Sequence, residues 1–398
     1  MLKLKPNARN AVMIGSMCSV SYLAVYIARN ILGTVSPQMI EQGTFNTEQV
    51  GLLSSIYFIT YAIGQLINGA IGDKIKAKVM ISLGLILAGV SNELFAIFAH
   101  LPFASYIAYG FTGYFLAMIY GPMTKVVAEN TEPIYATRCS LGYTFASFFG
   151  SPLAGVFAAL IAWQGVFLVS SITLILMGML CFIFFQILEN KGIVKYNQYD
   201  KPKGSRGGIK LLIKHKIIKF TIISVITGVV RTSVVFWLPT YISQYLGFSA
   251  EKSAGIFTVA TLFISLTAFI AVFLYERLGR NIDLAIIIVF ISATICFAAV
   301  YFIKQPVLNI IFMVLGIISS NSAASMLWSI YCPSLIDTGM VSGATGFLDF
   351  MSYMAASVAS SVFANAVSVI GWSGLILVWL ALMVVGIIIS LPLKKNYI

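Results

Sequence analysis

The sequence predicts an all-helical protein that crosses a membrane many times. Of its 398 residues, 59% are hydrophobic and only 10% are charged, and the mean hydropathy is +0.95. A soluble protein needs far more charge to cover its surface. Apolar runs of roughly 20 residues, long enough to cross about 30 Å of hydrocarbon, recur from one end of the chain to the other. A motif that occurs once in each half of the chain indicates that the helices form two related bundles.

We expect twelve membrane-spanning helices, one for each apolar run. Their expected bounds are 11–34, 50–71, 78–99, 102–124, 139–161, 165–188, 217–243, 252–275, 283–303, 307–331, 341–364 and 371–392. A polar, basic stretch rich in Gly and Pro separates the sixth run from the seventh, and such stretches mark boundaries. We therefore predict an N-terminal six-helix bundle at 1–188, a cytoplasmic linker at 189–216 and a C-terminal six-helix bundle at 217–398.

The lysines and arginines are distributed unevenly over the predicted loops. If the N-terminus is inside, only Lys252 and Lys304 of the 25 lie on the outer side, and Arg29 and Arg231 are the only two that are assigned to neither side. Positive residues concentrate in cytoplasmic loops, so both termini are expected in the cytoplasm. The net charge of +12 then reflects topology and contact with the lipid bilayer, with no role for nucleic acid. The short loops and the absence of a targeting segment favour a bacterial inner (plasma) membrane.

Residues that could form a catalytic or metal site are scarce. The two histidines, His100 and His215, fall in a loop and in the linker, and the five cysteines show no CxxC spacing. No pairing of a nucleophile with a base stands out either. We therefore expect no enzyme activity, no metal and no cofactor.

The repeated motif occurs in ARNILGTVSPQMIEQG and in VRTSVVFWLPTYISQY. An arginine in apolar surroundings is followed, at the same spacing in both stretches, by a proline, an isoleucine and a glutamine. The matched positions are Arg29, Pro37, Ile40 and Gln42 against Arg231, Pro239, Ile242 and Gln244. An internal repeat of six helices, with the substrate held between the halves, is typical of secondary transporters. We expect the two bundles to be related by a pseudo-twofold axis.

Placing the charged arginine of the motif in a membrane costs free energy. An ionised side chain at the bilayer centre costs about 2.5–3.5 kcal/mol on insertion scales, so two at equivalent points need a compensating role. Guanidinium offers a planar fork of donors that suits phosphate or carboxylate, which predicts that Arg29 and Arg231 bind an anion. The alternative is that each arginine pairs with a carboxylate inside the membrane. Glu93 and Asp349 are the carboxylates well inside predicted helices.

The sequence resembles the major facilitator superfamily and, within it, the organophosphate:phosphate antiporters. YLAVYIARN is similar to the family pattern of two tyrosines followed by a substrate arginine, and RTSVVFWLPTY and GFLDFMSYMAASVASS are similar to its seventh and eleventh helices. The resemblance implies exchange of a phosphorylated metabolite for phosphate by alternating access, and we expect a functional monomer. Asn30 and Gln65 stand where the family often has lysine. The implied substrate-binding residues are Tyr22, Tyr26, Arg29, Asn30, Gln65, Arg231, Trp237 and Tyr353.

Two predicted loops, GAIGDKIKAK and YERLGR, are similar to the cytoplasmic motif of the superfamily. At equivalent places they carry Asp73 with Lys74 and Glu276 with Arg277. We interpret these four residues as a cytoplasmic gate that favours one conformation. Ordinary positive-inside charge would account for the basic residues alone.

Asp349 and Glu93 leave the coupling mechanism open. Either carboxylate could compensate the charge of an arginine in the empty carrier, or it could carry a proton. A proton-coupled carrier of an organic carboxylate or another small solute therefore remains an alternative to organophosphate exchange. So does a transporter-like receptor that binds a sugar phosphate and signals through a partner protein.

Overall fold

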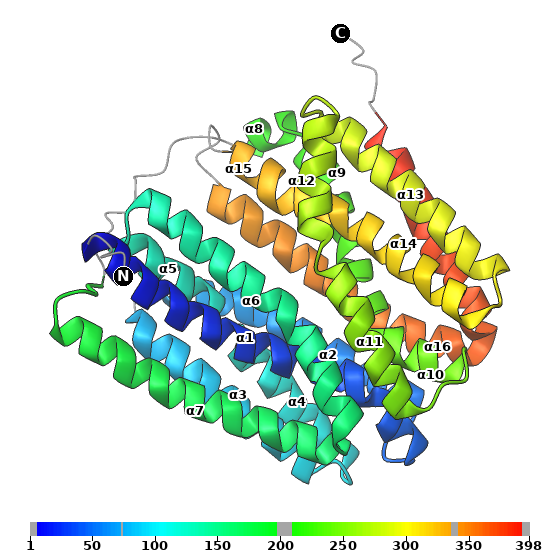
Figure 1. Cartoon of the computed structure of the whole chain (residues 1–398), viewed down its shortest axis with the longest axis horizontal. Coiled ribbons are helices and arrows are strands. Elements are labelled where there is room, and N and C mark those ends of the chain that lie inside the picture. The colour runs from blue at the N-terminus through cyan, green and yellow to red at the C-terminus, as the bar shows by residue number, and fades with distance from the viewer. Residues whose placement is uncertain (1–5, 73–74, 197–208, 336–340, 392–398) are drawn as a thin grey trace, which may run out of the picture. The chain divides into compact units, whose positions relative to one another are not determined.

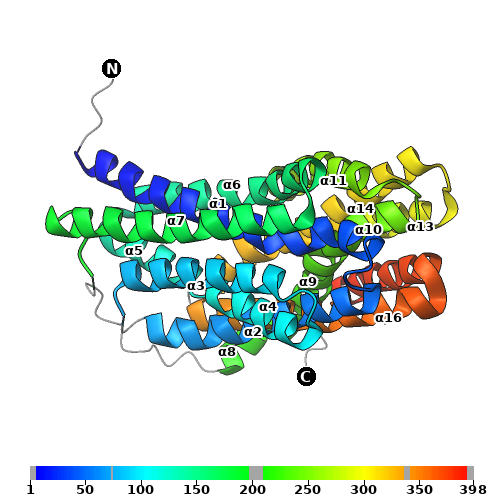
Figure 2. The same ribbon diagram turned by 90° about the horizontal axis from the view of Figure 1, so that it is seen from below.

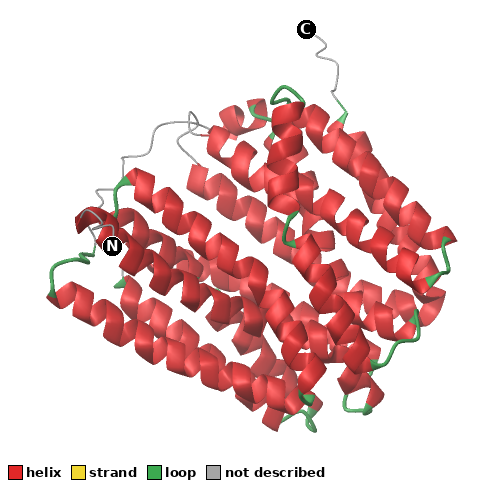
Figure 3. Cartoon of the chain, viewed as in Figure 1, coloured by secondary structure: helices red, strands yellow, loops and turns green. Residues whose placement is uncertain are grey.

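The computed structural model describes residues 6–72, 75–196, 209–335 and 341–391, and every regular element in these ranges is a helix (Figure 3). In chain order (Figure 1) they are α1 (Pro6–Glu41), α2 (Thr47–Gly72), α3 (Ala77–Ile97), α4 (Pro102–Leu116), α5 (Tyr120–Asn130), α6 (Pro133–Leu160), α7 (Trp163–Asn190), α8 (Ile209–Lys214), α9 (Ile217–Gly228), η1 (Val229–Val234), α10 (Val235–Gln244), α11 (Ala250–Ile264), α12 (Thr267–Arg277), α13 (Ile282–Phe302), α14 (Pro306–Met326), η2 (Leu327–Tyr331), α15 (Cys332–Ser334) and α16 (Val341–Ser390). The two η elements are π-helical turns.

The helices coincide with the predicted membrane spans. By length and hydropathy, nine continuous helical stretches in the described ranges can cross a membrane. The longest, α16, contains two of the predicted spans, because Gly371 interrupts its helical geometry with a φ of 68°, a conformation that glycine adopts without strain. The predicted fourth span corresponds to α4 and α5, and the fifth corresponds to α6. The prediction of an all-helical protein with twelve membrane helices is therefore confirmed.

Contacts between residues divide the chain into two compact units. Residues 1–201 form the first unit together with 249–261, and residues 202–248 form the second together with 262–398. Most of α11, as far as Thr261, therefore belongs to the first unit. The predicted bundles at 1–188 and 217–398 stay a prediction, and most of the predicted linker lies outside the described residues.

Each unit has its own pattern of helix packing. In the first unit α1 packs on α6, α3 packs on α7 and α2 packs on α4. In the second unit α13 packs on α14, and α16 packs on both α9 and α13. The first helix of each half, which carries the arginine of the repeated motif, thus lies against a later helix of its own unit.

In both units, the glutamine at the end of the repeated motif accepts a hydrogen bond from a tryptophan. The indole Nε1 of Trp163 donates a hydrogen bond of 2.9 Å to Oε1 of Gln42. In the second unit, Nε1 of Trp372 donates one of 3.3 Å to Oε1 of Gln244. Trp163 opens α7, and Trp372 directly follows the interruption of α16 at Gly371. The internal repeat therefore includes a tertiary contact as well as a sequence motif.

Replacing either glutamine with leucine should destabilise its unit. Both indoles are buried, so the loss of the acceptor leaves a donor without a partner, at a cost of about 1–3 kcal/mol. We expect Gln42→Leu and Gln244→Leu to lower the apparent Tm of the protein in detergent by similar amounts. Gln164→Leu is the control, because this exposed glutamine is next to Trp163. Unfolding of both variants at the wild-type temperature would show that the contacts carry no stability.

Candidate functional site

Arg29 of α1 lies between two tyrosine rings of the first unit. Its guanidinium carbon is 5.4 Å from the ring centroid of Tyr26 and 5.2 Å from that of Tyr61. A guanidinium at this distance from an aromatic face gains about 0.5–1 kcal/mol at exposed sites and about 2 kcal/mol when it is desolvated. Arg29 is only partly buried, so the rings support its charge without enclosing it.

Tyr22 connects this arginine to a larger group of tyrosines. Its ring centroid is 4.9 Å from that of Tyr26, 5.5 Å from that of Tyr120 and 5.9 Å from that of Tyr143. The approach of α6 to α1 depends on Gly150, because a Cβ there would lie 2.4 Å from Cβ of Tyr26. The structure thus brings Tyr22, Tyr26 and Arg29 together, as the sequence predicts.

Three other predicted residues of the first unit have different surroundings. The side-chain amide of Asn30 donates a 2.6 Å hydrogen bond to the carbonyl of Tyr26 in its own helix. Gln65 is half-buried on α2, one turn after Tyr61. Glu93 lies on α3, and its buried Oε2 accepts no hydrogen bond from the described residues. The described structure therefore shows no hydrogen bond through which this oxygen would compensate the charge of Arg29.

Arg231 lies in the π-helical turn η1, between α9 and α10. Such wide turns are uncommon and occur frequently at functional sites. The guanidinium carbon is 5.8 Å from the ring centroid of Trp328 and 5.6 Å from that of Tyr353. Trp328 belongs to the second π-helical turn, η2. Both irregular turns of the second unit therefore contribute a side chain to the same group.

Asp349 of α16 gives Arg231 a carboxylate neighbour. The distance between Nη2 of Arg231 and Oδ1 of Asp349 is 3.8 Å, and each side chain is 30% exposed. This separation is within the range of an ion pair but longer than a hydrogen bond. The two charges attract each other, and Nη2 itself is buried, but each side chain keeps an exposed part through which an anion could approach.

Close packing fixes this arrangement on both sides of Arg231. A Cβ at Gly228 would lie 2.3 Å from Oγ and 2.7 Å from the carbonyl oxygen of Ser352. The hydroxyl of Ser224 donates to the carbonyl of Leu348, and that of Ser233 donates to the carbonyl of Ala356, each at 2.8 Å. These contacts hold the segment with Arg231 against the segment of α16 that carries Asp349.

Trp237 and Trp328 differ from what the sequence suggests. Trp237 is fully buried, and its ring lies 6.5 Å from that of Trp372, so in this structure it belongs to the helix packing. Its role in substrate binding stays a prediction. Trp328 was missed, because aromatic residues in membrane helices face lipid by default. The polar run SSNSAAS just before it was the available signal that this face of the helix is not lipid-exposed.

The predicted cytoplasmic gate is described only in part, because Asp73 and Lys74 lie outside the described residues. Glu276 and Arg277 are exposed at the end of α12. The guanidinium carbon of Arg277 lies 5.3 Å from the ring centroid of Phe273. The gate therefore stays a prediction.

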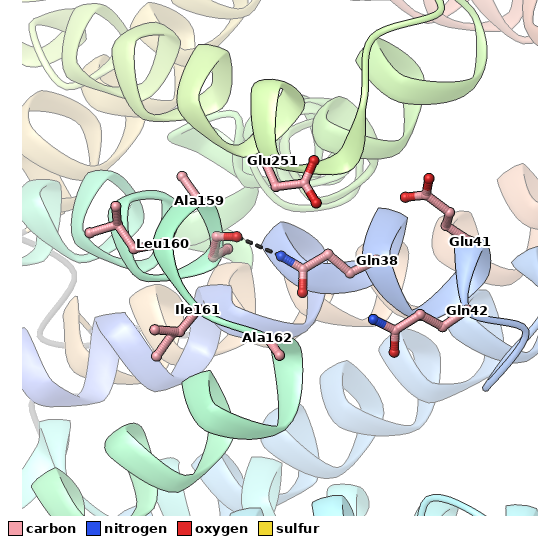
Figure 4. Close-up of a pocket in the computed structure, with 9 residues that line it drawn as sticks. Gln38, Glu41, Gln42, Ala159, Leu160, Ile161, Ala162 and Glu251 are labelled. Carbon is pink, nitrogen blue, oxygen red and sulfur yellow. Dashed lines mark hydrogen bonds between the residues drawn. The ribbon is translucent and has the colours of Figure 1, made fainter.

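A separate pocket of about 370 Å³ lies in the first unit, at the end of α1. Figure 4 shows the carboxylates of Glu41 and Glu251 directed toward each other above Gln38. The amide of Gln38 donates a 2.5 Å hydrogen bond to the carbonyl of Ala158. Two carboxylates and no basic residue line this pocket, so it is unsuited to an anion.

A metal site is also absent from the described ranges, where no group of three or more His, Cys, Asp or Glu side chains is placed to hold a metal ion. The polar groups around Arg29 and Arg231 are the two guanidinium cations, tyrosine hydroxyls and the carboxylate of Asp349. Such groups bind and orient an anion, and they include no activated nucleophile.

Comparison with known proteins identifies the family. Residues 18–360 match the model of the Major Facilitator Superfamily. The chain belongs to this superfamily. It is therefore a multi-pass membrane transporter and not an enzyme.

Individual relatives are distant but match long stretches of the chain. The phosphoglycerate transporter protein of Salmonella typhimurium is 24% identical over 394 residues, which cover 89% of this chain and 82% of that protein. The glycerol-3-phosphate transporter of Bacillus subtilis is 24% identical over 257 residues, or 59% and 58% of the two chains. The crystal structure of a bacterial homolog to the human lysosomal transporter Spinster superposes with a TM-score of 0.74 at 12% identity, covering 98% and 97% of the chains. This last similarity shows the fold alone.

The packing at Gly228 offers a test of how Arg231 is positioned. In Gly228→Ala the new methyl group must push α9 away from the Ser352 backbone, which overpacks the helix contact and costs about 1–3 kcal/mol. We expect a lower apparent Tm and weaker anion binding, because Arg231 is less than one turn away. Gly346→Ala, on α16, is the control, since nothing lies within 4 Å of its added Cβ. Equal behaviour of the two variants would show that this contact does not position the arginine.

Proposed function

We propose that the chain exchanges a phosphorylated metabolite for inorganic phosphate by alternating access, with Arg29 and Arg231 binding the anion. The observation that carries the proposal is the pair of arginines at matched positions of the repeat, each held against two aromatic rings. Two of the relatives, a phosphoglycerate transporter and a glycerol-3-phosphate transporter, support a phosphate ester as the substrate. Tyr22, Tyr26 and Tyr353 are the proposed hydrogen-bonding partners of the anion.

Charge balance explains why the transport would be an exchange. In a carrier that alternates access, the binding site must be closed off from water before it opens to the other side. Closing it around two guanidinium groups is costly, whereas a dianion neutralises both. The loaded carrier would then change conformation more readily than the empty one. An anion would have to be present on each side for rapid turnover.

Asp349 modifies this balance in one half. At 3.8 Å from Arg231 it already compensates part of the charge that the substrate would neutralise. The carboxylate therefore competes with the anion and lowers the cost of closing the empty site. We propose that Asp349 is a built-in counter-charge, which weakens anion binding but allows the empty carrier to return.

The same distance favours a second candidate function. A proton on Asp349 would remove its charge and release Arg231 for an anion, so that a proton and an anion could cross together. This describes a proton-coupled carrier of an organic carboxylate or another small anion. Competition by phosphate would argue against a carboxylate, and binding without flux would indicate a receptor instead of a carrier.

The proposal also covers the orientation of the chain in the membrane, the kind of membrane and the oligomeric state. The clustering of lysines and arginines in alternate loops supports cytoplasmic termini by the positive-inside rule, in a bacterial inner membrane. Asp73, Lys74, Glu276 and Arg277 would then form the cytoplasmic gate. We propose a monomer as the working unit, because each chain carries both arginines.

Phosphate uptake into proteoliposomes tests the main proposal. Vesicles are loaded with inorganic phosphate or left empty, and uptake of labelled phosphate is followed for the wild type, Arg29→Lys and Arg231→Lys. We expect uptake to be much faster into loaded than into empty vesicles, and a loss of about tenfold to a hundredfold in each variant, because lysine cannot replace the bidentate contact.

The matched control is Arg9→Lys, which changes an exposed arginine of the same helix, α1, and should leave uptake unchanged. Equal uptake into empty and loaded vesicles would contradict exchange. Full activity of both lysine variants would contradict anion binding by the arginines.

Asp349→Asn tests the counter-charge. Without the carboxylate, Arg231 is available to the substrate, and we expect phosphate to bind about fivefold more tightly, the equivalent of about 1 kcal/mol for a partly exposed ion pair. Uptake should also depend more strongly on internal phosphate, because the empty carrier returns more slowly. Glu48→Gln, at an exposed position in the first turn of α2, is the control. Unchanged affinity together with an unchanged pH profile would remove both proposed roles of Asp349.

A further inference from the structure

An apolar groove lies on the outer face of the first unit, between α3 and α7. It has a volume of about 360 Å³ and is lined by Val79, Ser82, Leu83 and Ile86 of α3 and by Met179, Phe182 and Ile183 of α7. Four of these side chains, Leu83, Met179, Phe182 and Ile183, are exposed large apolar groups. Both helices are long and apolar enough to span the membrane, so the groove opens toward lipid.

Two glycines explain the shape of this groove. A Cβ at Gly178 would lie 2.9 Å from the carbonyl oxygen of Ser82, and one at Gly89 would lie 2.8 Å from that of Ser171. The backbones of α3 and α7, which run side by side in Figures 1 and 2, therefore approach closely along their length. Beside this close contact, Leu83 of α3 and Met179, Phe182 and Ile183 of α7 are exposed and line the groove.

A charged group closes one end of the groove. Lys78, the residue before Val79, and Lys76 both form ion pairs with Glu189 in the last turn of α7. The ammonium of Lys78 also donates to Gln186 at 2.7 Å and lies 5.8 Å from the ring centroid of Phe182, which lines the groove. The charges thus begin where the apolar lining ends.

This group carries an excess of positive charge. Two lysines meet a single carboxylate, and the side chain of Lys76 is 51% exposed while that of Lys78 is nearly buried. Both ammonium groups lie within 6 Å of the ring centroid of Tyr196. Burial raises the pKa of the Tyr196 phenol, with the charge of Glu189 adding to the shift, so this ring adds no negative charge. Lys191 and Lys195 are exposed on the segment after α7.

We infer that this groove binds an anionic phospholipid of the surrounding bilayer, with an acyl chain between α3 and α7 and the phosphate at Lys76. The groove matches a phospholipid in chemistry and in the order of its parts. Its apolar lining suits an acyl chain, and the lysines at the helix termini suit the phosphate. Basic pockets between membrane helices commonly bind anionic head groups. A soluble anion would use the lysines alone and would leave the groove unexplained. The proposal is independent of the transport function.

Native mass spectrometry of the purified full chain tests the inference. Phosphatidylglycerol and phosphatidylcholine with identical acyl chains are titrated in separate experiments, and the occupancy of the first bound lipid is measured. We expect a preference for phosphatidylglycerol of about fivefold, since one lysine near the surface contributes about 1 kcal/mol. Lys76→Gln should abolish the preference, whereas Lys252→Gln, in the first turn of α11, should leave it unchanged.

Variants of the apolar part test the groove itself. Leu83→Trp fills the channel and should reduce the binding of phosphatidylglycerol, whereas Leu94→Trp, at another exposed position of α3, should not. Glu189→Gln removes the counter-charge of the two lysines and should strengthen the binding of phosphatidylglycerol, a gain that a purely structural role would not produce. Equal binding of the two lipids, equal losses in Leu83→Trp and Leu94→Trp, or weaker binding in Glu189→Gln would overturn the inference.

Discussion

A guanidinium group inside an apolar helix bundle must be compensated locally, and the two halves of this chain meet that requirement in different ways. Placing such a charge at the bilayer centre costs about 2.5–3.5 kcal/mol on insertion scales, a large part of the stability of a typical domain. Arg29 lies against Tyr26 and Tyr61. Arg231 lies against Trp328 and Tyr353 and has Asp349 as well. Arg231 itself lies in a π-helical turn, an irregular element that is frequent at functional sites.

The internal repeat separates what the two halves share from what distinguishes them. They share an arginine, a proline and a glutamine at the same spacing, and the glutamine of each accepts a hydrogen bond from a tryptophan of its own half. They differ in the carboxylate at Asp349 and in the irregular turns η1 and η2. The two halves thus share a scaffold, but the charges around their arginines differ. In the proposed mechanism, substrate must displace the counter-charge of Asp349 in the second half.

Much of this architecture could be predicted from the sequence, because the bilayer imposes simple rules on composition and length. The helix spans and the group of Tyr22, Tyr26 and Arg29 lie where the sequence places them. The π-helical turn in VVRTSV could not be predicted, because this segment contains no Gly or Pro. The close packing of the preceding Gly228 against Ser352 is a tertiary contact that local pattern does not indicate. The burial of Trp237 and the contact of Trp328 with Arg231 are likewise tertiary effects. The polar run before Trp328 indicates only that this face of the helix turns away from lipid; the partner of each tryptophan depends on helices far away in the sequence.

Whether the two arginines bind one and the same anion is tested most directly by a double-mutant cycle. Binding of inorganic phosphate to the purified chain is measured calorimetrically for the wild type, Arg29→Lys, Arg231→Lys and the double variant. If both contact one phosphate, the losses in binding free energy are not additive, with an interaction term of at least about 0.5 kcal/mol, as for residues that share a partner. Additive losses within error would mean that the arginines act at separate places, and would contradict a shared anion.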